Sequence, residues 1–356
     1  MSRPVPPIVG VSTSHTAFVG RFTRGPVGTP VKVTSTVELE RGFGLDSGSE
    51  ATDQVAAYFA NGGLVGWVVR LGRGTGWKRG IRALDAAPPG AFSLLCLPGA
   101  SALPSARHKD VLETALRYCE RRRAFLILDP PSAVDDAEAM TRYRNGDGFP
   151  QLSANGAIYF PRIDVATRSI GPSGAVAGRY AAIDAALGVW TAPAGTGAPL
   201  AGATLRRQPT EAESSALNAL GVNVLRSFPG AGTVIWGART LTGADREASE
   251  WKYVSVRRLA LFIEESIDQG TQWAPFEPND EPLWASVRLS VGSFLHELFR
   301  DGAFAGTSPR DAYFVRCDRS TMTQADIDNG NLIALVGFAP SRPAEFVVIR
   351  IQQRKP

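Results

Sequence analysis

Short apolar runs alternate with amphipathic helical segments through the middle of the chain. The runs AFSLLCLPG, AFLILDPP and GAIYFPRID indicate buried strands at residues 91–99, 124–131 and 156–164. Helical periodicity occupies the intervals at residues 105–123 and 135–145. The apolar face of the first of these helices consists of Val111, Leu112, Ala115, Leu116 and Cys119. Because parallel neighbouring strands are joined through covering helices, this alternation predicts an α/β fold with a mainly parallel sheet.

The preceding residues add further elements to this prediction. Residues 8–45 alternate apolar runs with Gly/Pro turns, which predicts two strands on either side of the loop RGPVGTP. The segment SEATDQVAAYFANGG predicts a helix that ends at Gly62 and Gly63, and LVGWVVRLG predicts the strand that follows it. These elements extend the predicted sheet toward the N-terminus.

The last third has a different pattern, in which two long amphipathic helices precede strands. The helices are expected at residues 246–270 and 280–302, joined by the proline-rich connector TQWAPFEPND. Asp280 suits the N-cap of the second helix, and Pro282 falls in its first turn, where proline is tolerated. The runs DAYFVRCD and NLIALVGFAP predict strands after these helices. This order indicates an α+β region.

The chain ends on PAEFVVIRIQQRKP, in which residues 345–351 predict one more strand. One face of this strand consists of Val347, Ile349 and Ile351, and the other of Phe346 and Val348, with Arg350 at the rim. Apolar residues on both faces are typical of a strand that is covered on both sides. Such a strand either completes a sheet of its own chain or pairs with an exposed edge on another molecule.

Composition and charge exclude several classes of protein. The chain has 356 residues, of which 44% are apolar and 20% charged, with a net charge of +4. The longest basic run is Arg121–Arg123, which is too short to predict nucleic-acid binding. No apolar stretch is long enough for a transmembrane helix, and the N-terminus lacks a signal-peptide pattern. The three cysteines, Cys96, Cys119 and Cys317, have no zinc or CxxC spacing and predict buried thiols.

Motifs of catalysis are missing from the sequence. The segment LGRGTG follows a predicted strand, but Trp77 stands where a dinucleotide fingerprint needs Gly or Ala, and no GK[ST] occurs. The histidines are His15, His108 and His296, without metal spacing or a GxSxG nucleophile motif. We therefore predict no catalytic residue, no bound cofactor and no metal.

Two acidic features are weaker candidates for chemistry. Asp129 directly follows a predicted parallel strand, at the sheet edge where α/β enzymes bind ligands. It is the best indication of an enzyme, although no partner constellation accompanies it. Glu264, Glu265 and Asp268 cluster on one predicted helix, where a salt-bridged helix face is the favoured interpretation.

Read together, the segments resemble the contractile tail sheath family, which includes sheaths of phage tails, pyocins and extracellular contractile injection systems. The resemblance is strongest in GTVIWGARTL, in WKYVSVRRLALFIEESIDQGTQWAPFEPNDEPLW and in AYFVRCDRSTMTQADIDNGNLIALVGFAPSRPAEFVVIRI. It continues upstream in VAGRYAAIDAALGVWTAPAG, LNALGVNVLRSF, FANGGLVGWVVRLG and GVSTSHTAFVGRFTRGPVGTP. The order of these segments matches that of the family, and the length is similar to that of the short sheaths of extracellular systems.

The resemblance implies a domain organisation. An N-terminal segment at residues 1–20 would pack with an inner α+β domain at residues 237–344, and residues 21–236 would form an outer α/β domain. Residues 345–356 would form a C-terminal strand or arm. Family members usually begin with an extra extended segment, often like PGVYVEE, where this chain has only MSRPVPPI. We therefore expect a short or differently built N-terminal arm.

The resemblance also implies what the chain does and what it contacts. The subunit would polymerise helically around an inner tube on a baseplate, with a terminator or cap protein, and would contract to drive the tube through a target envelope. Its inter-subunit strand would consist of Glu345, Phe346, Val347, Val348, Ile349, Arg350 and Ile351. Arg288 and Arg300 are candidates for a tube-facing helix surface. Assembly is expected in a bacterial or phage-infected cytoplasm, in a tail-like particle that is later released.

Two alternatives remain at the level of the sequence. A sheath-like cap or initiator protein of the same machinery would share the motifs without polymerising by itself. An α/β hydrolase-like enzyme that uses Asp129 would instead be a monomer or small closed oligomer with a substrate pocket.

Overall fold

The computed structural model describes residues 6–44, 49–74, 76–341 and 347–353. The chain divides into two compact units, the α/β unit (residues 12–258) and the terminal unit (residues 1–11 and 259–356). The boundaries expected from the resemblance were after residues 20 and 236. The units divide elsewhere because β1 (Thr16–Gly20) is a strand of the large sheet and Leu241 is buried in its core.

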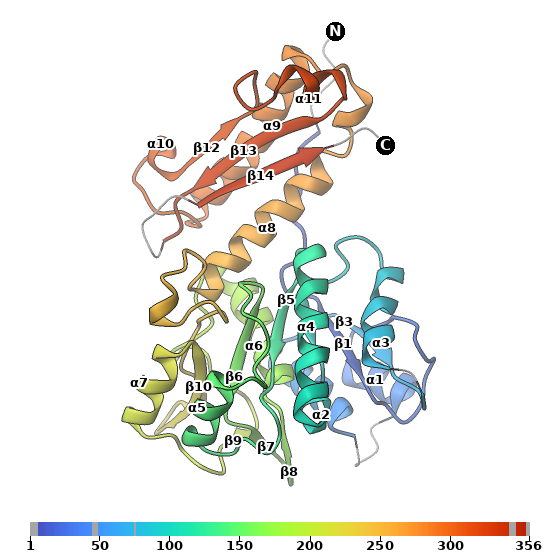
Figure 1. Cartoon of the computed structure of the whole chain (residues 1–356), viewed down its shortest axis with the longest axis vertical. Helices are drawn as coiled ribbons and strands as arrows, with labels where there is room; N and C mark the ends of the chain where they lie inside the picture. Colours follow the sequence, from blue (N-terminus) through green and yellow to red (C-terminus); the bar gives the residue numbers. More distant parts are fainter. Residues whose placement is uncertain (1–5, 45–48, 75, 342–346, 354–356) are drawn as a thin grey trace. The chain divides into compact units, whose positions relative to one another are not determined.

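Within the described residues, the core of the α/β unit is an eight-stranded sheet in the order β11-β10-β6-β5-β4-β1-β3-β2 (Figure 1). All neighbouring pairs from β10 to β3 are parallel, and β11 and β2 pair antiparallel at the two ends. The predicted mainly parallel sheet is therefore confirmed. The strands are β1, β2 (Val31–Val33), β3 (Gly66–Arg70), β4 (Leu94–Cys96), β5 (Phe125–Leu128), β6 (Gly156–Phe160), β10 (Val222–Phe228) and β11 (Gly232–Ile235).

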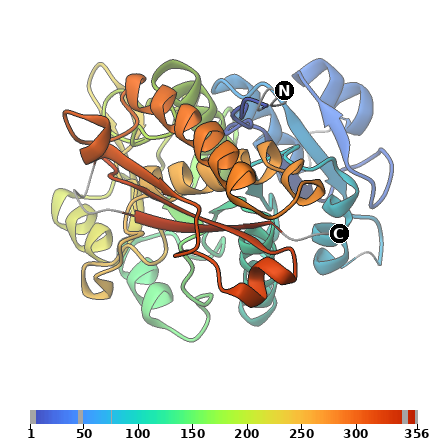
Figure 2. The ribbon, with the colours of Figure 1, turned by 90° about the horizontal axis from the view of Figure 1, so that it is seen from above.

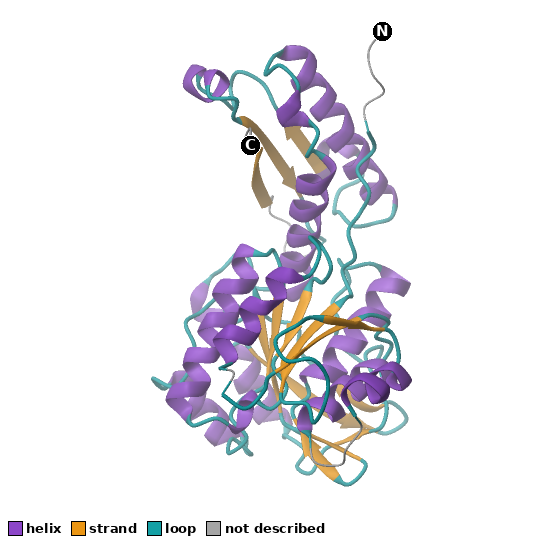
Figure 3. Ribbon diagram, turned by 90° about the vertical axis from the view of Figure 1, so that its right-hand side faces the viewer, coloured by secondary structure: helices purple, strands orange, loops and turns teal. Residues whose placement is uncertain are grey.

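Helices cover both faces of this sheet (Figure 3). One face packs against α2 (Glu50–Ala60) and α6 (Ser173–Leu187). The other carries α3 (Trp77–Ala83), α4 (Ser105–Arg121), α5 (Ala137–Asn145) and α7 (Glu211–Ala219). Strand periodicity separates the two layers, because Ala17 and Val19 face the α4 side while Phe18 contacts Tyr58 of α2 at 5.2 Å between ring centroids. The predicted apolar face of α4 is buried, as expected.

Strands β1 and β2 lie on either side of the loop RGPVGTP, as predicted. Strand β2 ends at Val33 and pairs with β3, and the next residues form helix α1 (Thr36–Phe43), which was not predicted. The Ser35 hydroxyl accepts a hydrogen bond from the Glu38 N–H at 3.2 Å, which caps this helix. Local capping and burial of the helix's apolar face outweigh the strand propensity of its β-branched residues. A small antiparallel sheet completes the unit with β7 (Ile163–Val165), β8 (Arg168–Ile170) and β9 (Ala203–Thr204).

The terminal unit combines long helices with an antiparallel sheet. Its described strands follow the order β12-β13-β14, and Figures 1 and 2 show them beside α9. The elements are α8 (Val254–Gly270), which runs through the boundary between the units, η4 (Ala274–Phe276), α9 (Glu281–Arg300), α10 (Pro309–Ala312), β12 (Tyr313–Arg316), α11 (Gln324–Asp328), β13 (Leu332–Phe338) and β14 (Val347–Gln353). The predicted N-cap is confirmed, since the Asp280 carboxylate accepts a hydrogen bond from the Leu283 N–H.

The N-terminal residues pack along these helices. The Ser290 hydroxyl of α9 donates to the Pro6 carbonyl at 2.8 Å, and the Ser266 hydroxyl of α8 accepts from the Val11 N–H at 3.1 Å. Ile8 is buried against Gly270. A β-carbon added to Gly270 would lie 2.7 Å from the Ile8 side chain. Among the described residues, no helix is both long and apolar enough to cross a membrane.

Candidate functional site

The predicted inter-subunit strand coincides with β14 in most of its length. Val347, Val348, Ile349, Arg350 and Ile351 belong to β14, while Glu345 and Phe346 lie outside the described residues. In the isolated chain β14 pairs antiparallel with β13 from the same chain. A single chain offers no neighbour to pair with, so strand donation between subunits stays a prediction.

The two faces of β14 differ in burial. Ile349 and Ile351 are buried on one face, where they stand opposite Val336 and Ala334 of β13. Arg350, between them in sequence, is exposed on the other face. Ile349 and Ile351 are therefore covered, and Arg350 is exposed as expected for a residue at the rim.

The sheet of the terminal unit has unpaired edges. In the described part of this unit no strand pairs with the outer side of β14 or of β12, which are the first and last strands of the sheet. Unpaired strand edges present rows of backbone N–H and C=O groups and act as templates for another strand. This geometry suits association through added strands.

Gln353 fastens the end of β14 to α8. Its side-chain amide donates to the Asp268 carbonyl at 3.1 Å and to the Thr271 hydroxyl at 3.0 Å. The strand predicted from the sequence ended at Ile351, two residues before Gln353. A signal was present, because Gln353 continues the period-two series of Val347, Ile349 and Ile351.

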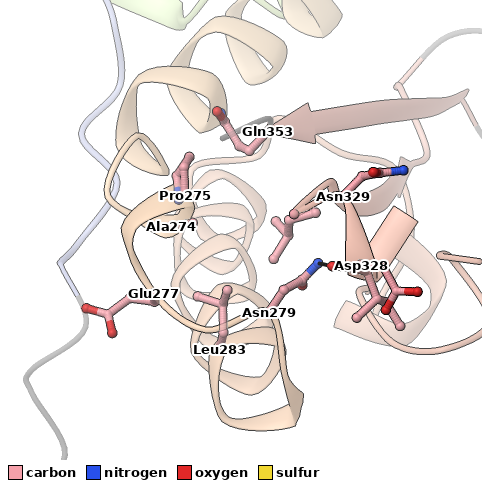
Figure 4. Close-up of a pocket in the computed structure, with 11 residues that line it drawn as sticks. Ala274, Pro275, Glu277, Asn279, Leu283, Asp328, Asn329 and Gln353 are labelled. Carbon is pink, nitrogen blue, oxygen red and sulfur yellow. Dashed lines mark hydrogen bonds between the residues drawn. The ribbon is translucent and has the colours of Figure 1, made fainter. Parts of the chain in front are cut away.

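A polar pocket of about 180 Å³ lies next to Gln353. Figure 4 shows it between the end of β14 and the segments that carry Asn279 and Asp328, while the carboxyl group of Glu277 points away. The Asn279 amide is held by the Asn331 carbonyl at 3.1 Å and by the Trp284 indole N–H at 2.8 Å. The volume is below that of typical small-molecule sites, so the pocket fits a polar side chain better than a substrate. Among the described residues no cluster of His, Cys, Asp and Glu could hold a metal.

The two arginines predicted to face a tube have different environments. Arg288 donates to the Cys317 carbonyl and, at 2.5 Å, to the Glu281 carboxylate. Arg300 is exposed in the last turn of α9 and has no ion pair within the described residues. Arg288 therefore has a structural role in its own chain, whereas Arg300 is available to a partner.

Asp129, the best enzyme candidate, is a buried hydrogen-bond acceptor. Its carboxylate accepts from the Ser173 N–H at 2.9 Å, the Ser173 hydroxyl at 2.7 Å and the Gln54 amide at 3.0 Å. Burial raises the pKa of Asp129 to about 6 despite these donors. Ser173 is the first residue of α6, whose N-cap Pro172 has no capping side chain. Asp129 thus caps α6 from across the chain.

The cavity that the described residues form beside Asp129 is small. The adjoining cavity, which His108 also lines, has a volume of about 10 Å³, close to that of one water molecule. Burial lowers the pKa of His108 to about 4. His15 contacts the Ala91 carbonyl and His296 the Tyr313 hydroxyl, so the three histidines stay apart from one another. The LGRGTG segment leads into α3, where Trp77 is buried.

Models of sheath domains match most of the chain. The model described as phage tail sheath protein central domain matches residues 77–241, and that described as phage tail sheath C-terminal domain matches residues 246–354. The helical sheath of the anti-feeding prophage, solved in the contracted state, is 30% identical, covers 99% of this chain and 98% of its own, and has a TM-score of 0.77. The chain belongs to the contractile tail sheath family. The resemblance found in the sequence is confirmed.

Two further sheath proteins place this member within the family. The sheath complex of an extracellular contractile injection system, PVC, in the contracted state matches with a TM-score of 0.82 and 28% identity over 99% of this chain and 95% of its own. The tail sheath protein of Vibrio phage KVP40 is 25% identical over 231 residues, which is 62% of this chain. The chain spans about a third of that relative's length, since the match covers 32% of it.

Proposed function

We propose that this chain is a structural subunit of the contractile sheath of an extracellular injection system. The observation that carries the proposal is the end-to-end likeness to the PVC sheath, at a TM-score of 0.82. Copies would assemble helically around an inner tube, start from a baseplate and end at a terminator protein. Assembly would take place in the cytoplasm of the producing bacterium, and the particle would act after release.

The two units would have different positions in this polymer. The terminal unit (residues 1–11 and 259–356) would face the tube, and the α/β unit would lie outside. The open edges of β12 and β14 support this assignment, because a polymer that must stay connected while its subunits reorient needs main-chain contacts between copies. Residues 345–351 would be donated to a neighbour, in a head-to-tail contact that yields a filament.

Contraction would need no nucleotide. The extended sheath would be kinetically trapped, and a signal from the baseplate would release the first ring. Subunits would then move largely as rigid bodies and gain contacts with their neighbours, so that the change propagates and drives the tube forward.

Electron microscopy tests the assembly. Purified protein, alone and co-expressed with its tube and baseplate proteins, is examined in negative stain. We expect wide hollow cylinders with a helical lattice. Discrete particles under both conditions would contradict the sheath proposal and favour a cap or initiator protein.

A disulfide cross-link tests strand donation directly. Leu335 and Arg350 stand opposite each other across β13 and β14, so the double variant Leu335→Cys/Arg350→Cys can form a bond across this pair. Oxidised monomers should close the bond within one chain, whereas oxidised cylinders should give a ladder of covalent oligomers if the strand is exchanged. The single variant Arg350→Cys is the matched control. Only intramolecular bonds in cylinders would refute donation.

A further inference from the structure

The chain passes between its two compact units only twice, after residues 11 and 258. The first crossing leads through a short extended segment into β1. The second lies inside α8, whose residues up to Arg258 belong to the α/β unit. Any force that travels along the chain between the units must therefore enter the α/β unit through these two places.

Arg258 stands at the second crossing, and its guanidinium group bonds the segment that follows the first. Its guanidinium donates at 2.8 Å to the carbonyl oxygen of Thr13, which follows the first crossing by two residues. Arg258 is also the last residue of the α/β unit before the second crossing. The same group makes a two-point ion pair with Asp184 of α6, at 3.0 and 2.6 Å. Both side chains are only 3% exposed.

The surroundings hold this ion pair in one geometry. The Arg258 guanidinium lies over the ring of Tyr180, 4.6 Å from its centroid, and the Tyr180 hydroxyl contacts that of Tyr159 in β6. A planar arginine fork matches a carboxylate with two parallel hydrogen bonds, which a lysine cannot do. Arg258 is thereby tied to α6 and to the central sheet.

The first crossing enters the sheet at a strong position. β1 is an interior strand with parallel partners β3 and β4 on its two sides. The Tyr58 hydroxyl also donates to the Ser14 carbonyl at 3.1 Å, just before the strand begins.

We propose that Arg258 is a mechanical pin, a positioning residue that joins both chain crossings to α6 through Asp184 and the Thr13 carbonyl, so that force passed between the units ends in the core of the α/β unit. The inference rests on the proposed sheath function, because a contracting polymer loads the two crossings in every firing. A buried ion pair without this role would contribute to folding alone.

Single-molecule pulling by the two termini tests the pin. Both termini belong to the terminal unit, so tension reaches residues 12–258 through the two crossings once the terminal unit has given way. Unfolding of this unit gives a length step of about 85 nm, at roughly 3.4 Å per residue. We expect Arg258→Gln to unfold this step at roughly half the wild-type force, because the variant releases Thr13 and leaves Asp184 unpaired. Arg258→Lys, which keeps the charge but not the fork, should give an intermediate force.

Arg162→Gln is the matched control. Arg162 forms a partly buried ion pair with Glu50 in the same unit, at 3.0 Å, and bonds Ser101 and Ser169 without contacting either crossing. Its loss should lower the melting temperature but leave the unfolding force within about a tenth of the wild-type value. Equal force losses in Arg162→Gln and Arg258→Gln, or an unchanged force in Arg258→Gln, would overturn the pin. Electron microscopy of the wild type tests cylinder formation separately. Failure of the sheath proposal is therefore distinguished from failure of the proposed role of Arg258.

Discussion

The α/β unit and the terminal unit differ in how an edge strand of the main sheet is covered. In the α/β unit, loop residues 195–200 bond the outer side of β11, and even the buried Asp129 has three donors. In the terminal unit, the described sheet ends in unpaired strands on both sides, with a polar pocket at the end of β14. The chain itself thus covers the outer side of β11, whereas the outer sides of β12 and β14 are open among the described residues.

Charge follows the same division. The α/β unit has 28 Lys and Arg against 21 Asp and Glu, whereas the terminal unit has 10 against 13. Opposite net charges on two parts of one subunit favour contacts between unlike parts of neighbouring copies. The difference agrees with a polymer in which copies meet head to tail.

The largest effect is expected from removing the open strand. Deletion of residues 345–356 takes away β14 and exposes the β13 side chains that Ile349 and Ile351 cover. Loss of these two buried side chains alone removes roughly 3–6 kcal/mol from the terminal unit. We expect cylinders to disappear and hydrogen exchange to rise in β13 but not in β5. Deletion of residues 354–356 alone is the control, and intact cylinders from the longer deletion would contradict strand donation.

Glycine substitutions should sharpen the contrast in packing. A β-carbon at Gly174 of α6 would lie 2.1 Å from the Gln54 carbonyl oxygen of α2, so Gly174→Ala should destabilise the α/β unit by about 1–3 kcal/mol. Gly292 of α9 has no such neighbour within 4 Å, so Gly292→Ala should stabilise the terminal unit by about 0.5–1 kcal/mol. Urea unfolding of both variants measures the difference. Equal changes would show that close packing does not distinguish the units.

Two buried groups of the α/β unit make its free energy of unfolding depend on pH in opposite directions. The folded pKa of Asp129 is raised from 3.8 to about 6 by burial, so its contribution to stability is complete below 3.8 and is lost as pH rises through about 6. Burial lowers the pKa of His108 from 6.5 to about 4, so its contribution is present above 6.5 and is lost as pH falls through about 4. The two slopes oppose each other in the wild type.

Single variants should reveal each slope. Between about pH 4.5 and 6, Asp129→Asn should become more stable with rising pH, and His108→Gln less stable, by about 1.4 kcal/mol per pH unit in each case. Urea unfolding at both ends of this range measures the free energy of unfolding, with the nearly flat wild type as reference. Parallel slopes in the two variants would show that one of the groups is not buried as described.

The smallest effect concerns the arginines of α9. Arg300→Gln should change monomer stability by less than about 0.5 kcal/mol, because an exposed side chain without a partner is removed. The same variant should weaken binding to the tube protein in a co-sedimentation assay. Arg288→Gln breaks contacts with Glu281 and Cys317 inside the chain and is the comparison. Unchanged tube binding by Arg300→Gln would remove this residue from the proposed contact.

Local patterns in the sequence determined much of this protein. Short apolar runs, helical spacing and a capping residue predicted the parallel strands, the buried face of α4 and the N-cap at Asp280, because each depends on residues a few positions apart. Long motifs also predicted the sheath family. Helix α1 was not predicted, because its β-branched residues favour a strand. The Ser35 cap and the burial of one helix face outweigh that preference.

Tertiary structure alone decided the contacts between distant segments. β1 lies between β3 and β4, Asp129 caps a helix that begins 44 residues later, and Arg258 meets Thr13 across 245 residues. The sequence placed Asp129 at a strand end, where a catalytic and a capping carboxylate look alike. The packing of α6 against the end of β5 gave the Asp129 carboxylate its hydrogen-bond donors and left only a small cavity beside it. Burial and hydrogen-bond partners depend on the whole fold, not on spacing along the chain.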